Sequence, residues 1–374
     1  MNRKIKVMYY VSGLISGGVE QMLYNYCKFM DHSKFEFIIV YQHTPVASCK
    51  EKLEDIGCKT IRITARSENF IENIFESYQI IKKYKPDIVH AHMNLMNFCP
   101  LLAAFFAGIK IRISHSHIAE KNKGVLFRIF SYICKKLNML FANFLMTCGK
   151  EAGEYLYGKK KMETKKVQMV ENAIELEYYK KDENIRSRIR EQLGVENGLV
   201  VGHIGRFTKQ KNHKRLIEIF EKLLELESNA YLLLVGSGEL EDDIKISAKK
   251  KGIFERIIFY GTTKDMYLIY NAMDIFVLPS LYEGFPVVSV EVQAADVPSI
   301  FSDRIAQSCK LTSAIEFLSL DLSDEIWAEK IFQRAHEFRD EINDSTEFMK
   351  KYDIRYKAVV LQRYYIDLIK KYKE

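Results

Sequence analysis

Two carboxylates stand eight residues apart in the stretch PSLYEGFPVVSVE, residues 279–291. Glu283 lies before a tight turn, and Glu291 falls within the helix that we expect to follow it. If the segment were helical throughout, the two residues would be separated by roughly 12 Å. Two carboxylates that share a proton or flank one bond, as in glycoside hydrolases, lie closer together. We therefore expect two separate acceptors for donors on one elongated ligand, such as the hydroxyls of a sugar and of a ribose.

The turn between these glutamates is suited to begin a helix. Pro286 is favoured in the first turn of a helix, because its missing N–H group would have no partner there. The free N–H groups that begin at Val287 would face an anion such as a phosphate. Gly284 and Phe285 complete the turn. We therefore expect phosphates to bind between the two carboxylates.

A pair of glycines precedes the first expected helix, in the stretch SGLISGGVE. Gly17 and Gly18 would let the backbone approach a ligand closely, and the N–H groups at the helix start favour a phosphate. The spacing is not GxGxxG and gives only weak support to a dinucleotide site. An ordinary turn between strand and helix is the alternative.

A basic loop, GRFTKQKNH (205–213), stands at the equivalent place in the second half of the chain. Arg206 offers a bidentate fork and Lys211 a point charge, a pairing that suits a diphosphate. Asn212 can cap the helix that follows. A solvated basic loop is the alternative. Gly236, after the next expected strand, allows close backbone approach to a nucleoside.

Four histidines lie in pairs at the ends of two expected strands, in VHAHMN and SHSHIAE. Alternation along a strand places His90 and His92 on one side, and likewise His115 and His117. Four histidines could indicate zinc, although no carboxylate or thiolate is spaced with them. A core or capping role is a second interpretation. A histidine that handles a proton or a developing charge at a strand end is the third.

The elements that must position these residues are short strands that alternate with helical segments. This pattern predicts α/β domains with parallel, doubly wound sheets, and it restarts near residue 199. We expect two Rossmann-like domains that face each other across a cleft, with ligands outside the carboxyl ends of the strands. The expected boundaries are residues 1–180 and 181–350, followed by a helix over 351–374 that packs back on the first domain.

The composition is that of a soluble globular protein: 374 residues, 48% hydrophobic and 28% charged. The net charge of +7 would suit an anionic substrate or an anionic membrane surface, and we expect no nucleic-acid partner. Seven scattered cysteines without CxxC spacing indicate reduced thiols. The apolar run 98–109 is too short to cross a bilayer. A signal peptide is not favoured, and we expect a cytoplasmic protein.

The sequence lacks several motifs that are typical of other catalytic and phosphate-binding sites. The sequence has no Asp-x-Asp, so a metal–diphosphate clamp has no obvious ligands. It has neither the GxxxxGK[ST] phosphate loop nor the GxSxG nucleophile elbow. We therefore expect no metal cofactor.

Taken together, these stretches resemble the retaining glycosyltransferases of family GT4, which have the GT-B fold. The resemblance rests on GGVE, GRFTKQKNH, LLLVGSGELE, FYGTTKDM and AMDIFVLPSLYEGFPVVSVEVQAA, and the last of these contains the family's E-x7-E pattern. Within the family, the chain looks most like bacterial capsular and exopolysaccharide glycosyltransferases.

The resemblance implies that the second domain binds a nucleotide-sugar donor, with a UDP-sugar expected, and that the first binds a glycan or polyprenyl-linked acceptor. Arg206 and Lys211 would hold the diphosphate, Glu283 the donor sugar and Glu291 the ribose. Gly17 and Gly18 would meet the phosphate or the acceptor. His117, or as second choice His115, would lie near the reacting carbon. Such enzymes need no metal. The further expected donor contacts are Gly236, Gly284, Phe285, Pro286 and Val287.

One residue departs from the family pattern, and one segment raises the question of membrane binding. The family usually has glycine where this chain has Asp296, a residue that adopts left-handed geometry less easily. The segment 121–146 mixes Lys and Arg with Phe, Leu and Ile, and such a helix could lie on the anionic inner face of the plasma membrane. An ordinary core helix is the alternative.

Other functions within the fold remain open from the sequence. A sugar-nucleotide epimerase or a phosphorylase would share the second domain, and a non-catalytic nucleotide-sugar binding protein would keep the contact residues. The GGVE loop together with both glutamates favours the transferase.

Overall fold

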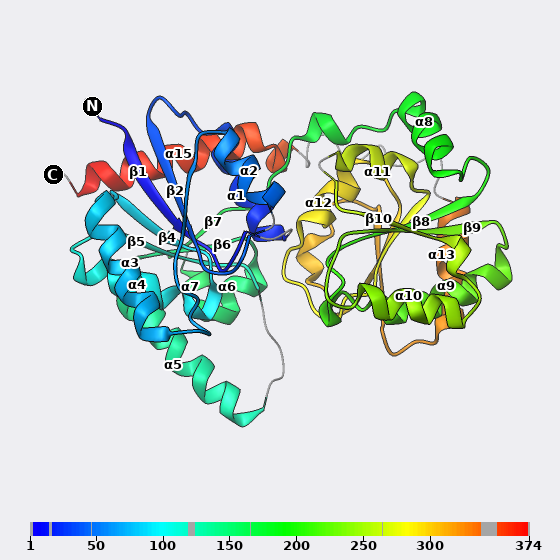
Figure 1. Cartoon of the computed structure of the whole chain (residues 1–374), viewed down its shortest axis with the longest axis horizontal. Coiled ribbons are helices and arrows are strands. Elements are labelled where there is room, and N and C mark those ends of the chain that lie inside the picture. The colour runs from blue at the N-terminus through cyan, green and yellow to red at the C-terminus, as the bar shows by residue number, and fades with distance from the viewer. Residues whose placement is uncertain are drawn as a thin grey trace. The chain divides into compact units, whose positions relative to one another are not determined.

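The computed structural model describes residues 3–14, 17–45, 47–118, 124–164, 166–263, 265–337 and 350–372. The chain divides into two compact units (Figure 1): Met1–Ala173 with Ile354–Glu374, and Ile174–Asp353. The second unit begins a few residues before the expected boundary. The C-terminal segment belongs to the first unit.

The first unit is built on a seven-stranded sheet whose neighbouring strands are all parallel, in the order β3-β2-β1-β4-β5-β6-β7. Parallel neighbours need crossover connections, which explains the helices between the strands. The strands are β1 (Ile5–Tyr10), β2 (Phe35–Tyr41), β3 (Lys59–Arg62), β4 (Ile88–Ala91), β5 (Ile111–Ser116), β6 (Phe144–Thr147) and β7 (Val167–Met169).

Helices α1 to α7 connect these strands, and the C-terminal helix α15 returns to them. In Figure 1, α15 (red) lies beside α1 (blue), and its inner face joins the same hydrophobic core through Leu361, Tyr365 and Leu368. The helices are α1 (Gly18–Phe29), α2 (Ala47–Asp55), α3 (Phe70–Tyr84), α4 (Phe98–Phe106), α5 (Val125–Phe141), α6 (Lys150–Tyr157), α7 (Lys159–Glu163) and α15 (Ile354–Lys371).

The second unit has a six-stranded parallel sheet in the order β10-β9-β8-β11-β12-β13. Its strands are β8 (Leu199–Ile204), β9 (Ala230–Val235), β10 (Ile257–Gly261), β11 (Ile275–Leu278), β12 (Ser299–Ser302) and β13 (Ile315–Leu318). Its helices are α8 (Glu183–Leu193), α9 (His213–Leu226), α10 (Glu241–Lys250), α11 (Met266–Ala272), α12 (Val287–Ala294) and α13 (Asp324–Glu337). The two parallel α/β units confirm the predicted fold class.

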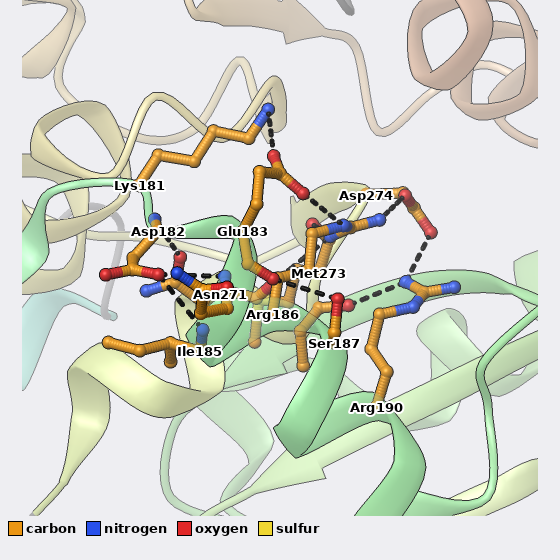
Figure 2. A network of polar contacts seen from close by, with 12 residues as sticks. Lys181, Asp182, Glu183, Ile185, Arg186, Ser187, Arg190, Asn271, Met273 and Asp274 are labelled. Atoms are coloured by element: carbon orange, nitrogen blue, oxygen red, sulfur yellow. Dashed lines mark hydrogen bonds and ion pairs between the residues drawn. The ribbon is translucent and has the colours of Figure 1, made fainter.

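A buried carboxylate joins α8 to the strands of the second sheet (Figure 2). Asp274, just before β11, accepts hydrogen bonds from Arg186 at 2.5 Å and Arg190 at 3.0 Å. It also accepts one from the backbone N–H group of Val200 at 2.8 Å. The two arginines lie on one face of α8, and both bond the same carboxylate.

Two described helices lie near the C-terminal end of the chain. The helix expected over 351–374 corresponds to α15, and α13 is described as far as Glu337. Residues 338–349 lie outside the described part. Among the described residues, no helix combines the length and the apolar character that crossing a bilayer requires.

Candidate functional site

The stretches that the sequence singles out in the second unit share one edge of its sheet. They follow the carboxyl ends of β8, β9, β10 and β11, which are neighbours in the sheet. Ligands of open α/β sheets bind outside this edge. The topology therefore brings the loops of Arg206, Gly236 and Glu283 to the same side of the unit.

The basic loop and the glutamate loop are bonded to each other. Leu281 donates its N–H group to the carbonyl oxygen of Gln210 at 2.9 Å, and the Gln210 amide donates to the carbonyl oxygen of Tyr282 at 3.0 Å. Asn212 precedes α9, but its side chain donates to the carbonyl oxygen of Pro279 at 3.0 Å. The prediction that the Asn212 side chain caps α9 is therefore wrong, because the residue has a left-handed backbone (φ 58°) and serves the neighbouring loop.

Lys211 and Glu283 form an ion pair, with 2.8 Å between Lys211 Nζ and Glu283 Oε1. Their side chains are only 15% and 12% exposed. A partly buried carboxylate gains from a cation that offsets its loss of hydration. Arg206, by contrast, is exposed. The two residues that were expected to bind a diphosphate and a sugar separately are thus in contact with each other.

The turn after Glu283 begins a helix where the sequence predicts one. Pro286 stands immediately before α12, whose first residue is Val287. Phe285 is buried, and its ring stacks on that of Tyr352 at 5.7 Å between centroids and 12° between planes. Gly284 is also buried. The aromatic contact therefore anchors the turn that leads into α12.

Glu291 lies inside α12 and is only 5% exposed. Tyr179 donates a hydrogen bond to Glu291 Oε1 at 3.0 Å, and Tyr270 donates one to Oε2 at 2.7 Å. Burial raises the pKa of Glu291, and the two hydroxyl donors oppose that shift. Neither tyrosine can be assigned to the site from the sequence, because both lie far from Glu291 along the chain, in other elements.

The glycines of the expected site differ in their backbone conformation and in what surrounds them. Gly236 has φ 142°, and a Cβ atom there would stand 2.1 Å from the carbonyl oxygen of Gly205. The close approach at Gly236 is thus to the neighbouring loop of the protein. Gly17 is the residue before α1, with an ordinary extended backbone, and Gly18 is the first residue of the helix.

The four histidines form one buried cluster at the carboxyl ends of β4 and β5. His90 Nε2 lies 3.1 Å from His115 Nδ1, and His92 Nδ1 lies 2.8 Å from His117 Nε2. His90 Nδ1 also contacts the hydroxyl group of Tyr365 at 2.7 Å. The C-terminal helix therefore contributes directly to the cluster, a contact between residues too far apart in the chain to be read from the sequence.

All four imidazoles are neutral near pH 7. Burial lowers the pKa of His117 to about 3 and, with the neighbouring histidines, the pKa values of the other three well below the ordinary value. The His117 backbone N–H group donates to Asn94 Oδ1 at 2.8 Å, which fixes the end of β5. As a neutral ring, His117 can offer a hydrogen bond but carries no charge.

Three of these histidines also have nitrogens close enough to consider a metal. One nitrogen from each of His90, His92 and His115 lies within 4.8 Å of the others. However, both nitrogens of His90 already have hydrogen-bond partners, and the rings of His90 and His115 stack at only 10°. Lone pairs lie in the ring plane, so parallel stacked rings do not aim them at one point. The cluster resembles a hydrogen-bonded core more than a set of converging ligands.

A cavity of about 950 Å³ lies at the opposite edge of the second sheet. Its lining includes Leu199 and Asn229 at the amino ends of β8 and β9, together with the arginines and Asp274 of Figure 2. These charged side chains are already paired with one another. The cavity lining does not include Arg206, Lys211 or Glu283, but it does include Tyr270, which bonds Glu291.

The two family models that match this chain describe glycosyltransferases, and so do the names of two similar proteins. A family model described as Glycosyltransferase Family 4 matches residues 16–178, and one described as Glycosyl transferases group 1 matches residues 185–312. EpsF of Bacillus subtilis (strain 168), a glycosyltransferase by name, is 31% identical over 340 residues, which cover 88% of each chain. A UDP-Gal:alpha-D-GlcNAc-diphosphoundecaprenol alpha-1,3-galactosyltransferase of Escherichia coli is 26% identical over 263 residues, 68% of this chain and 67% of that one.

Solved structures show the same fold. The crystal structure of Anabaena HepE in complex with UDP and glucose superposes with a TM-score of 0.81 and 17% identity, over 96% of this chain and 98% of that one. The identity to EpsF over most of both chains, together with the two family models, decides the assignment. The chain is a member of the family 4 glycosyltransferases, with the GT-B fold.

Proposed function

We propose that the protein is a retaining hexosyltransferase that uses a UDP-sugar and acts on a glycan or polyprenyl-linked acceptor in surface polysaccharide biosynthesis. The observation that carries this proposal is the Lys211–Glu283 ion pair, set beside the start of α12 at the carboxyl edge of the second sheet. A cation and free helix N–H groups together suit a diphosphate, and an adjacent carboxylate suits sugar hydroxyls. The name of the similar E. coli enzyme refers to UDP-Gal, and the similar Anabaena structure is a complex with UDP and glucose.

In this proposal the protein acts mainly by electrostatics. The bond between the anomeric carbon and the diphosphate breaks, and the diphosphate keeps the electron pair. The acceptor oxygen bonds to the same carbon, and its proton passes to the departing phosphate. Lys211, Arg206 and the α12 N–H groups stabilise the negative charge that develops, with no metal required. Glu283 orients the sugar. His117 is the first unit's candidate for a neutral hydrogen-bond partner of the substrate. Retention of configuration is carried over from the family resemblance.

A donor screen tests this function directly. The full chain is heated with UDP-sugars, GDP-sugars and the free diphosphates, with and without EDTA. A ligand present at about 100 times its Kd should stabilise the protein by about 2.7 kcal/mol. We expect one UDP-sugar to shift the Tm equally with and without EDTA. A shift that EDTA abolishes would overturn the metal-free mechanism, and no shift with any donor would overturn the function.

We also propose that α5 binds an anionic membrane surface, where a polyprenyl-linked acceptor would reside. Its apolar residues face outward at helical spacing, and the exposed Arg128 and Lys136 lie on the same helix. Exposed apolar area with basic residues is typical of helices that lie in the interface. The exposed apolar side chains of α5 are Val125, Leu126, Ile129, Phe130, Tyr132, Ile133 and Leu140. These exposures argue against an ordinary core helix.

Flotation with liposomes tests the membrane proposal, and the chain offers a matched control. Ile133 on α5 and Ile246 on α10 are both 51% exposed. Ile133→Glu should reduce flotation with anionic vesicles severalfold, because it places a negative charge on the binding face. Ile246→Glu should leave flotation unchanged. Equal behaviour of the two variants, or no flotation of the wild type at low salt, would contradict the proposal.

A further inference from the structure

The carboxylate of Glu291 is held by two tyrosines from different elements. Tyr179 comes from the short 3-10 helix Leu176–Tyr179, and Tyr270 comes from α11. Their rings also contact each other, at 5.7 Å between centroids and 61° between planes. Tyr270 is only 1% exposed. Each hydroxyl group reaches a different oxygen of the same carboxylate, so neither oxygen can rotate away without losing a bond.

The Glu291 carboxylate can accept only a few further hydrogen bonds, and only from certain directions. An ionised carboxylate can accept about four hydrogen bonds, two on each oxygen. The tyrosines use one position on each oxygen, which leaves one acceptor position on each. Two neighbouring hydroxyl groups, as in the 2′,3′-diol of a ribose, match that arrangement. A 2′-deoxyribose offers only one of the two donors.

Burial makes such a site selective. A buried polar group that is built to bond a hydroxyl group loses its partner when the ligand lacks that hydroxyl. A hydrogen bond to a charged group contributes about 1.5–3 kcal/mol, which corresponds to a roughly 10- to 100-fold change in Kd. The loss of affinity is largest when the carboxylate cannot reorient to bond water instead. The two tyrosines prevent that reorientation.

We propose that Tyr179 and Tyr270 are positioning residues that fix Glu291 to recognise the ribose diol, and so make the site selective for ribonucleotides over 2′-deoxyribonucleotides. The inference rests on the proposed function, in which the second unit binds a nucleotide-sugar, and on the expectation from the family resemblance that the ribose lies at Glu291. It goes beyond that function by naming the groups that create the selectivity. A purely structural role, in which the tyrosines only attach the segment near Tyr179 to α11 and α12, is the competing explanation.

The test compares UDP with 2′-deoxy-UDP by isothermal titration calorimetry on the full chain, or GDP with 2′-deoxy-GDP if the guanine nucleotide is the one that binds. The wild type should bind the ribonucleotide roughly 10- to 100-fold more tightly. Tyr270→Phe should weaken ribonucleotide binding and leave deoxyribonucleotide binding nearly unchanged, so that the ratio of the two Kd values falls to within a few-fold of one. Tyr179→Phe should act in the same direction.

Tyr267→Phe is the matched control, because Tyr267 lies on the same helix and its ring packs against Tyr178 instead of the Tyr179–Glu291–Tyr270 group. For this variant, the ratio of the two Kd values should equal that of the wild type. If Tyr270→Phe weakens both nucleotides equally, the tyrosine is only structural and the proposal is overturned. If the wild type binds both nucleotides equally well, Glu291 does not recognise the diol, although the donor site stands. Failure of every nucleotide to bind would overturn the proposed function itself.

Discussion

At the scale of single residues, the two carboxylates of the candidate donor site differ in the groups that stabilise them. Lys211 bonds Glu283, whereas Glu291 relies on two tyrosine hydroxyl groups. A lysine can be drawn towards a second anion, but a hydroxyl group adds no charge. The pair at Glu283 is therefore suited to exchange partners when a diphosphate arrives, and the group around Glu291 is suited to stay in place.

Loss of the Lys211 ammonium group should impair the reaction strongly. Lys211→Met removes the partner of Glu283 and a cation that we expect to stabilise the leaving diphosphate. Loss of one such preorganised contact typically lowers the rate by about 10²- to 10³-fold. We expect kcat/KM to fall in that range, measured with the donor found by the screen. Lys209→Met, an exposed lysine of the same loop, should change kcat/KM less than about threefold. Similar rates for both variants would remove Lys211 from the site.

Asp296 gives a residue-scale prediction about pH. It has a left-handed backbone (φ 52°), as expected at a position where the family usually has glycine. Burial raises its pKa from 3.8 to about 6. Because the folded state favours the protonated form, Asp296 destabilises the fold increasingly as pH rises from about 4 to 6, and fully above that. Asp296→Asn, which stays neutral, should therefore raise the Tm at pH 7.5 and by roughly half as much at pH 5.0. A Tm difference that does not change with pH would contradict this assignment.

At the scale of elements, local patterns predicted well what depends on near neighbours. Helix α9 follows the basic loop as expected and spans His213–Leu226, with Leu216, Ile219 and Phe220 buried. Helix α12 begins after Pro286 as the proline indicates. What the sequence could not supply are contacts set by packing between distant segments. The role of Asn212, the tyrosines around Glu291 and the contact of Tyr365 with His90 all belong to that class.

The C-terminal helix allows an element-scale test with adjacent residues. Tyr365 is fully buried and contacts both Tyr9, at 3.0 Å between hydroxyl oxygens, and His90. Tyr364 is only partly buried. Truncation of a buried aromatic side chain typically costs about 3–5 kcal/mol, through lost contacts and a cavity. Tyr365→Ala should therefore lower the Tm of the first unit by several degrees more than Tyr364→Ala. Equal losses would show that α15 does not complete the core as described.

At the scale of the whole molecule, the chemistry is distributed unevenly between the two units. The ion pair, the α12 start and Glu291 with its tyrosines all belong to Ile174–Asp353. The first unit offers the neutral histidine cluster and the outward face of α5. We therefore assign the proposed donor site to the second unit, and the proposed acceptor and membrane functions to the first.

Hydrogen exchange on the full chain can check that division. Amide protection reports local opening, and a bound ligand slows exchange where it stabilises the backbone. UDP alone should protect the loops after β8 and β11, especially 205–212 and the start of α12, because the phosphates are expected to meet those N–H groups. The histidine strands β4 and β5 should change little until an acceptor is added. Protection concentrated within residues 1–173 would mean that the first unit binds the nucleotide, since the helix N–H groups at Gly17 and Gly18 would then serve the role assigned here to α12.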